Sequence, residues 1–327
     1  MGVLNLTPDS FSDGGRLGTV EAVLRQGRRM LAQGAAVLDL GAQSTRPGAS
    51  EVGPAEELSR LLPALRGLQE LRREHPAMLL SIDTFHAAVA EAALAEGADW
   101  INDVRGANQT AEAPGGTLRD PAMLPLIARS GCPYVLMHSR GTSQTMDRLA
   151  VYGDVVAEVR ADLQAATSSA LSAGVRPEQI IWDVGLGFAK TTDQNLELLR
   201  RLQELIEPAS GSGSITWGND AMVDPTASTN DHGHDHGHLQ QGGADPRCAQ
   251  QPRRNQPHSA TYPLLVGPSR KRFIGAVLDE PRPRARLWGT AAVCALATSA
   301  GAQILRVHDV GPIAQTVRMA AALALND

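Results

Sequence analysis

Polar side chains follow eight short apolar stretches of this sequence, and their types suit the binding of a nitrogen-rich heterocycle that carries an anion. A single polar residue after an apolar stretch needs no explanation beyond contact with solvent. A polar group after each of eight stretches indicates a lined cavity, provided that the stretches end on the same side of the fold. The residues are Asn5, Asp39, Asp83, Asn102 with Asp103, His138, Asp183, Ser269, and Arg306 with His308.

These side chains fall into two chemical groups. Asp83, Asp183 and Asn102 offer oxygens that accept hydrogen bonds from the N–H groups of a flat heterocycle. Lys271 could donate a hydrogen bond to a carbonyl oxygen of the same ring. The second group is cationic and suits phosphate: Arg46, Arg270, Arg306 and His308. A heterocycle that bears a diphosphate satisfies both groups.

The elements that must position these residues alternate between strands and helices. Eight apolar stretches are typical of buried strands, at residues 2–6, 37–40, 78–83, 100–104, 134–138, 180–183, 264–269 and 304–308. Helical patterns separate them, and alternation of this kind predicts parallel strands with right-handed crossovers. Eight units favour a single-domain (β/α)8 TIM barrel over an open doubly wound sheet, and its site would lie at the carboxyl ends of the strands.

Composition excludes several classes of partner. The formal net charge is −5, so nothing global attracts nucleic acid, and no apolar stretch is long enough to span a membrane. Three scattered cysteines without a Cys-x-x-Cys motif favour a reducing compartment, and we expect a cytoplasmic protein. The chain begins inside its first strand, so we expect either an open barrel base or a start farther upstream.

One segment interrupts the alternation. Residues 208–261 are rich in Gly, Ser, Asp, Asn, Gln and His, and we interpret them as a disordered insertion within the single domain 1–327, between the sixth helix and the seventh strand. Alternate histidines at 232–238 could bind Zn²⁺, Ni²⁺ or Cu²⁺. A flexible, adventitious chelator is the interpretation we favour over a physiological metal site.

Six ordered motifs resemble the dihydropteroate synthase family. The resemblance runs nearly end to end, except for residues 208–261, and the first two motifs are close to diagnostic. It includes Thr7-Pro8-Asp9-Ser10-Phe11 and Ser44-Thr45-Arg46-Pro47-Gly48. The six motifs lie at residues 5–15, 41–48, 101–103, 187–191, 267–275 and 306–310.

The resemblance implies an enzyme of folate synthesis with a (β/α)8 barrel. Such an enzyme joins 6-hydroxymethyl-7,8-dihydropterin diphosphate to 4-aminobenzoate and releases diphosphate, usually with Mg²⁺. The family pattern also implies a homodimer formed through the last helices. Loss of diphosphate would leave positive charge on the pterin, which carboxylates stabilise, above all Asp83. The aromatic amine is already nucleophilic, so attack needs no strong base.

The resemblance also assigns residues position by position. The pterin would be held by Asp83, Asn102, Asp183 and Lys271, of which Asp83, Asn102 and Lys271 are expected to be catalytic. The diphosphate would be held by Asn5, Thr45, Arg46, Arg306 and His308, with Asn5 also contacting Mg²⁺. The aminobenzoate site would comprise Phe11, Thr45, Arg46, Pro47, Phe188, Lys271 and Ser269.

Several residues have a plain structural interpretation beside the functional one. Asp39 would either line the pocket or brace the loop that follows its strand, and Asp103 would point away from the pocket. For His138 we favour local hydrogen bonds over a ligand contact, and for Lys190 a role in its loop. Arg140 departs from the family pattern, as does Ala189, which stands where glycine is usual.

Two other functions compete with the first. A pterin-dependent methyltransferase barrel would share the Asp and Asn residues that hold the pterin. Such a protein lacks the Thr-Pro-Asp-Ser-Phe and Ser-Arg-Lys loops and needs a corrinoid partner, so both loops favour the synthase. A non-enzymatic pterin-binding relic is the third interpretation, and the presence of every expected site residue argues against it.

Overall fold

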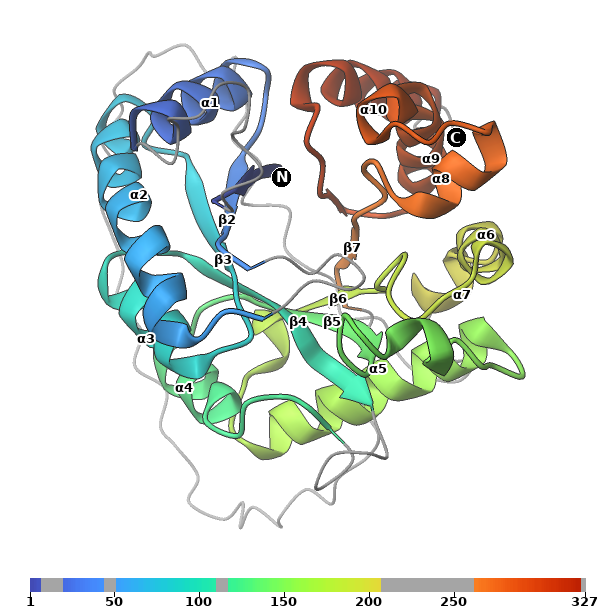
Figure 1. The fold of residues 1–327 in the computed structure, drawn as a ribbon, viewed down its shortest axis with the longest axis horizontal. Helices are drawn as coiled ribbons and strands as arrows, with labels where there is room; N and C mark the ends of the chain where they lie inside the picture. The colour runs from blue at the N-terminus through green and yellow to red at the C-terminus, as the bar shows by residue number, and fades with distance from the viewer. Residues whose placement is uncertain (7–19, 44–50, 110–116, 207–261, 325–327) are drawn as a thin grey trace, which may run out of the picture. The chain divides into compact units, whose positions relative to one another are not determined.

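The computed structural model describes residues 1–6, 20–43, 51–109, 117–206 and 262–324 (Figure 1). Contacts divide the chain into two units, one of Met1–Glu207 with Tyr262–Asp327 and one of Pro208–Thr261. The second unit lies outside the described residues. The predicted insertion and its histidine-rich run therefore stay predictions.

Eight parallel strands form one sheet in sequential order. They are β1 (Gly2–Asn5), β2 (Val37–Gly41), β3 (Leu79–Asp83), β4 (Trp100–Gln109), β5 (Tyr134–Arg140), β6 (Ile180–Asp183), β7 (Leu264–Val266) and β8 (Ile304–Leu305). The segment after β8 returns to β1 through a parallel bridge between Gly2 and Val307, where the Val3 amide donates to the Val307 carbonyl at 2.9 Å. The predicted (β/α)8 barrel is confirmed.

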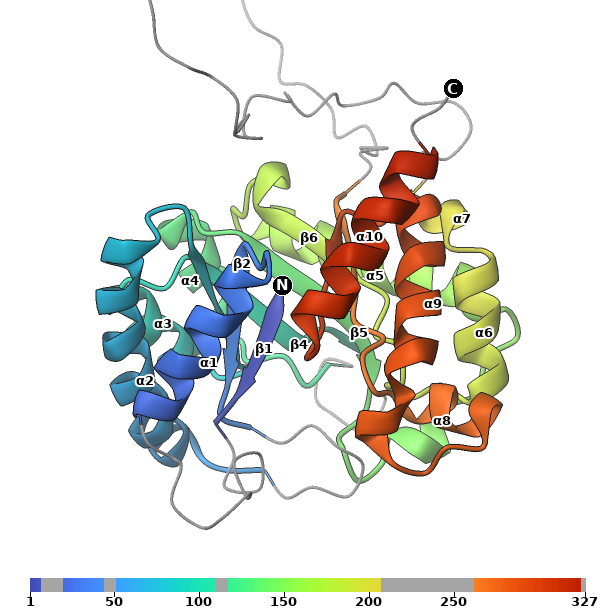
Figure 2. The same ribbon diagram turned by 90° about the horizontal axis from the view of Figure 1, so that it is seen from above.

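Helices separate the strands and surround them, as the two views show (Figures 1 and 2). They are α1 (Val20–Ala32), α2 (Pro54–Glu74), α3 (Ala87–Ala95), α4 (Met123–Ser130), α5 (Val155–Ser172), α6 (Thr192–Arg200), α7 (Gln203–Ile206), α8 (Arg272–Leu278), α9 (Leu287–Ser299) and α10 (Val310–Ala324). Two of them, the short α8 and the longer α9, connect β7 to β8, where the alternation predicted one. An additional short helix at this point is common in barrels of this kind.

Local contacts set the ends of several elements. The α5 helix begins at Val155, because the Asp154 side chain caps it by accepting from the Val156 and Ala157 amides at 2.9 and 3.0 Å. The β4 strand continues to Gln109, with an irregularity in its pairing with β5 between Asp103 and Ala107. Since β7 and β8 are short, Ser269 and Arg306 both follow the ends of their strands.

Candidate active site

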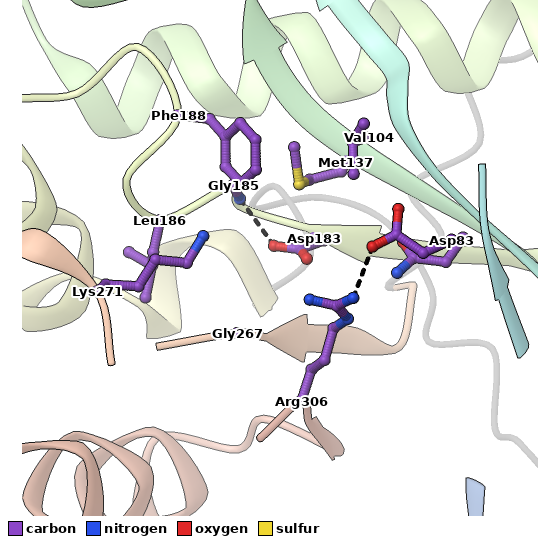
Figure 3. Close-up of a pocket in the computed structure, with 11 residues that line it drawn as sticks. Asp83, Val104, Met137, Asp183, Gly185, Leu186, Phe188, Gly267, Lys271 and Arg306 are labelled. Carbon is purple, nitrogen blue, oxygen red and sulfur yellow. Dashed lines mark hydrogen bonds and ion pairs between the residues drawn. The ribbon is translucent and has the colours of Figure 1, made fainter. Parts of the chain in front are cut away.

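A cavity of about 390 Å³ lies at the carboxyl ends of the strands (Figure 3). Its lining comes from β3, β4, β5, β6, the β6–α6 loop, the turn after β7 and the residue after β8. The lining residues are Asp83, Asn102, Val104, Met137, Asp183, Gly185, Leu186, Phe188, Gly267, Lys271 and Arg306. The barrel thus brings together residues from distant parts of the chain, at the edge where sites of this fold are built.

Arg306 ties two strands together at the floor of this cavity. Its Nε donates to Asp39 Oδ2 at 2.6 Å, and its Nη2 donates to Asp83 Oδ2 at 2.6 Å. The Asn102 side chain also donates to Asp39, at 3.3 Å, and Asp39 is completely buried. Among the described residues, Asp39 therefore orients Arg306 and Asn102. We call Asp39, Asp83 and Arg306 the floor triad.

Burial raises the pKa of two carboxylates that line the cavity. It raises the pKa of Asp83 to about 7, although the Arg306 guanidinium acts in the opposite direction, and the Asp39 charge adds to the rise. Burial likewise raises the pKa of Asp183, against the hydrogen bond that the Gly185 amide donates to its Oδ1 at 2.8 Å. Both groups are therefore easier to protonate than a carboxyl in water.

Asn102 presents an unsatisfied acceptor. Its Oδ1 is buried and has no hydrogen-bond partner among the residues that the structure describes, while its Nδ2 is engaged with Asp39. A buried carbonyl oxygen without a partner is costly, and a ligand N–H would remove the penalty. Asn102 and Asp183 therefore face the cavity with oxygens suited to the donor edge of a heterocycle.

Lys271 and Phe188 form another wall of the cavity. Lys271 precedes α8, and its Nζ lies 4.3 Å from the centre of the Phe188 ring. Phe188 packs against a cluster of Phe85, Val104 and Met137. Burial lowers the pKa of Lys271 to about 8, opposed by the nearby Asp183 carboxylate. This wall combines an aromatic face with an ammonium donor.

Asn5, Ser269 and His308 form a hydrogen-bonded group outside the cavity lining. The His308 Nδ1 lies 2.9 Å from Ser269 Oγ, and its Nε2 lies 3.4 Å from Asn5 Nδ2. An amide nitrogen only donates, so Nε2 accepts and Nδ1 carries the proton. Burial, reinforced by Arg270 and Arg306, lowers the pKa of His308 to about 3. The lowered pKa favours the neutral imidazole, whereas the sequence indicated a cation.

The chain matches a family model described as pterin binding enzyme over residues 1–215 and 222–308. The dihydropteroate synthase of Synechocystis sp. is 40% identical over 323 residues, which cover 99% of this chain and 89% of that protein. This chain belongs to the dihydropteroate synthase family. It is therefore a transferase of folate biosynthesis.

Solved structures of this family have the same fold. The Xanthomonas albilineans dihydropteroate synthase with 4-aminobenzoic acid gives a TM-score of 0.74 at 34% identity, covering 100% of this chain and 93% of that chain. The Yersinia pestis dihydropteroate synthase in a sulfonamide drug complex gives a TM-score of 0.75 at 31% identity, covering 99% and 93%.

The structure divides the predicted site residues of this dihydropteroate synthase family member into three sets. Six of them share the cavity: Asp83, Asn102, Asp183, Phe188, Lys271 and Arg306. Three lie in the neighbouring hydrogen-bonded group: Asn5, Ser269 and His308. Four lie outside the described residues: Phe11, Thr45, Arg46 and Pro47.

Arg270 does not join the cationic group predicted for it. Its guanidinium pairs with both oxygens of Asp309, at 3.0 and 2.7 Å, and it is absent from the cavity lining. Its backbone has a φ of 61°, which turns the chain sharply between β7 and α8. The described part of the site is consequently less cationic than the sequence indicated, because a carboxylate partner neutralises Arg270.

The structural roles predicted for two strand-end residues, Asp103 and His138, are confirmed. Asp103 faces away from the cavity, where it accepts from the Tyr134 hydroxyl at 2.7 Å and the Arg105 amide at 2.8 Å. His138 is completely buried between Asp162 and Lys190 and does not line the cavity. Neither side chain is placed to bind a ligand.

A set of hydrogen bonds made by Gln43, which follows β2, was not predicted from the sequence. The Gln43 side chain donates to the Val52 carbonyl at 2.7 Å and accepts from the Val52 amide at 3.1 Å, and it also donates to buried Glu57 at 3.0 Å. These bonds join the two ends of the segment that contains Arg46. Glu57 lies four residues before Leu61, on the apolar face of α2, and a glutamate at that position in the sequence was the signal that could have revealed it.

A second cavity of about 390 Å³ adjoins the first and was also not predicted. The two share Val104 and Phe188, and the second is lined further by Phe85, Arg105 and Arg140 among others. Arg105 stacks on Phe85 and pairs with Glu51, while Arg140 pairs with Glu158 and Asp162. Both arginines thus already have carboxylate partners.

Proposed function

We propose that the cavity binds 6-hydroxymethyl-7,8-dihydropterin diphosphate and joins its pterin to 4-aminobenzoate, forming 7,8-dihydropteroate and diphosphate. The observation that carries this assignment is the arrangement of buried acceptors, Asn102 Oδ1 with the Asp83 and Asp183 carboxylates, opposite the Lys271 ammonium. A pterin offers N–H donors along one edge and a carbonyl oxygen beside them. Its hydrogen-bonding edge is therefore complementary to the lining.

We infer a dissociative displacement from the charges of the site. The C–O bond to the diphosphate breaks, and its electron pair leaves with the diphosphate oxygen. The positive charge that remains spreads over the methylene carbon and the ring, next to Asp83. The amine lone pair then forms the new C–N bond, and the proton released from nitrogen goes to water. Of the five N–H donors of Arg306, Nε and Nη2 hold the floor triad, so those on Nη1 would face the leaving diphosphate.

Mg²⁺ fits this site as a partner of the substrate. The described residues contain no group of three or more His, Cys, Asp or Glu side chains that could hold a metal ion. Mg²⁺ commonly keeps its waters and binds through one or two protein oxygens and substrate phosphates. Because Asn5 directs its Nδ2 to His308, its amide oxygen is the atom that would contact the ion. When bound, Mg²⁺ would stabilise the charge that grows on the diphosphate.

We assign the aminobenzoate to the wall formed by Phe188 and Lys271. The ring of Phe188 offers an aromatic surface, and the ammonium at 4.3 Å from its centre offers a positive charge near a carboxylate. We assign further residues to the same site: Ser269 and the loop residues Phe11, Thr45, Arg46 and Pro47. A sulfonamide that resembles aminobenzoate should therefore compete with it, as the Yersinia pestis complex suggests.

Formation of dihydropteroate by the purified full-length protein tests this function. We expect product only when the pterin diphosphate, 4-aminobenzoate and Mg²⁺ are all present, with one diphosphate released per product. Pterin binding without turnover would indicate a binding relic. Methyl transfer to a corrinoid protein, with no requirement for aminobenzoate, would indicate the methyltransferase alternative.

We also propose a homodimer formed through α8, α9 and α10. These helices expose large apolar side chains, and patches of this kind mark interaction surfaces. The residues are Val277, Leu278, Trp288, Leu296, Met319 and Leu323. Sedimentation of the wild type and of Trp288→Glu tests the proposal, because a charge at this exposed position should yield monomers. Sedimentation of both proteins as the same species would contradict it.

A cytoplasmic location remains our proposal from cysteine usage. Cys132 and Cys294 are both buried and free, in keeping with a reducing compartment. None of the helices in the described ranges has the length and hydropathy to cross a membrane. Fractionation of cells that express the full chain would test the location.

A further inference from the structure

The sequence contains only two lysines, Lys190 and Lys271, among 30 basic residues, so the other 28 are arginines. Lys271 lines the cavity, and Lys190 lies at the end of the loop that carries Phe188. A chain that otherwise uses arginine for its positive charges keeps an ammonium group at these two positions. An ammonium is a compact charge with three donors, whereas a guanidinium is a planar fork.

The contacts of Lys190 match the three donors of an ammonium group. Its Nζ lies 3.1 Å from the Gly185 carbonyl oxygen, 3.0 Å from the Phe188 carbonyl oxygen and 2.8 Å from His138 Nδ1. The residue is only 7% exposed. Burial lowers the pKa of Lys190 well below the usual value for lysine, opposed by the Asp183 charge, but three acceptors around Nζ require three N–H donors and so favour the ammonium form. Two of the three bonds hold the backbone of the β6–α6 loop, and one of those two is at Phe188 itself.

His138 is oriented to accept the third bond. Its Nε2 lies 3.1 Å from Asp162 Oδ2 on α5, and a carboxylate only accepts, so Nε2 carries a proton and the neutral ring accepts at Nδ1. Asp162 also accepts from Arg140 at 3.2 Å, and Arg140 bonds Glu158 at 3.0 Å. The departure of Arg140 from the family pattern thus extends this network.

The loop is packed too tightly to move freely. Gly185 has a φ of 63°, and a Cβ added there would lie 1.8 Å from the His138 carbonyl oxygen. At the other end of the loop, Asn195 accepts from the Gly187 amide at 2.7 Å and donates to the Lys190 carbonyl at 3.2 Å. The end of β5 and the start of α6 therefore hold both ends, and Lys190 fixes the turn between them.

We propose that Lys190 is a positioning residue whose ammonium, oriented by His138 and Asp162, holds the 185–188 turn so that Phe188 faces Lys271 and the aminobenzoate. This inference rests on the proposed place of Phe188 in the aminobenzoate site. Asp183 belongs to β6 and is held by strand pairing as well. Loss of Lys190 should therefore disturb aminobenzoate binding much more than pterin binding.

Steady-state kinetics of full-length Lys190→Met and Lys190→Arg variants test the proposal. Methionine keeps the volume and removes the donors, and we expect its KM for aminobenzoate to rise about 10-fold or more, because small displacements of a binding group are expensive. The KM for the pterin diphosphate should stay within about twofold. Arginine should not rescue the aminobenzoate KM, because its planar fork does not match three acceptors.

Phe188→Ala keeps this test separate from the test of the aminobenzoate site. If Phe188→Ala leaves the aminobenzoate KM unchanged, the proposed place of Phe188 is wrong. If it raises that KM while a folded Lys190→Met variant does not, the positioning role is wrong. Equal rises of both KM values in Lys190→Met would also overturn the proposal, because they would indicate a general structural role.

Nitrogen-15 labelling of lysine gives a readout that does not depend on activity. The wild type has only two lysine side chains, and Lys190→Met identifies the signal of Lys190. We expect a shifted, slowly exchanging ammonium signal that Asp162→Asn alters, because an amide can present its NH₂ to His138 and change the tautomer. A Lys190 signal that is the same in the wild type and Asp162→Asn would contradict the proposal that Asp162 and His138 orient the ammonium group.

Discussion

The floor triad and the β6–α6 loop are each held together by one cation, and the two cations differ in type. In the floor, the Arg306 guanidinium bridges the carboxylates of Asp39 and Asp83 on neighbouring strands. In the loop, the Lys190 ammonium binds two backbone carbonyls and one imidazole. A planar fork matches carboxylates, and a compact donor matches converging carbonyls. We therefore assign to the floor the control of charge at the reacting carbon, and to the loop the position of an aromatic wall.

The largest effect should follow a change in the floor. Asp83→Asn removes the charge nearest the developing cation, and we expect diphosphate release to slow by about 100-fold, more than pterin binding weakens. Rapid-mixing measurement of diphosphate release checks this. Asp103→Asn is the control, because Asp103 is a completely buried carboxylate on the neighbouring strand that faces away from the cavity, so its variant should lose stability and keep the release rate. Unchanged release in Asp83→Asn would refute the catalytic role.

The floor should also contribute to stability more than an exposed pair does. Arg306→Met leaves buried Asp39 without its ionic partner, and we expect a loss of about 3 kcal/mol in the free energy of unfolding. Arg272→Met is the control, because Arg272 pairs with Asp147 at an exposed position, and it should cost less than about 1 kcal/mol. Urea unfolding measures both, and similar losses would remove the distinction between the floor and the surface.

The pH dependence should report the charge of Lys271. Because the pKa of Lys271 is lowered to about 8 from 10.5, its ammonium is lost as the pH rises through 8. We expect kcat/KM for the pterin diphosphate to fall above that pH. The free energy of unfolding should change in the opposite direction. Between pH 8 and 10.5 the unfolded chain binds more protons at Lys271 than the folded chain does. The destabilising effect of Lys271 on the folded state therefore diminishes as the pH rises. Profiles of the wild type and Lys271→Met test this, and the alkaline fall should be absent in the variant.

The smallest effect should follow relief of backbone strain in the loop. Ala189 is fully buried with a φ of 47°, a conformation that glycine adopts without a steric penalty. We expect Ala189→Gly to change stability by less than about 1 kcal/mol, because reduced strain and greater chain entropy oppose each other. If Lys190 holds the loop, the aminobenzoate KM should stay within about twofold of the wild type. A large rise in that KM would mean that the alanine backbone holds the turn.

Much of the fold could be predicted because its signals are local. Apolar stretches of strand length, helices ending at glycine and strict alternation depend on neighbouring residues, and they predicted all eight strands near their observed positions. The continuation of β4 to Gln109 was not predicted, because it depends on pairing with β5 and not on local apolar character. The second helix between β7 and β8 was missed, because α8 is too short to give a clear periodic pattern.

The sequence alone determined the family, the barrel and the gathering of Asp83, Asn102, Asp183 and Lys271 at one end of it, since motif spacing and strand-end polarity specify these. Only the tertiary structure decided which charged side chains remain unpaired and able to act on a ligand. Arg306 pairs with carboxylates 267 and 223 residues away, Arg270 is neutralised by Asp309, and burial lowers the pKa of His308. Charge state depends on burial and on competing partners, which chain order does not specify.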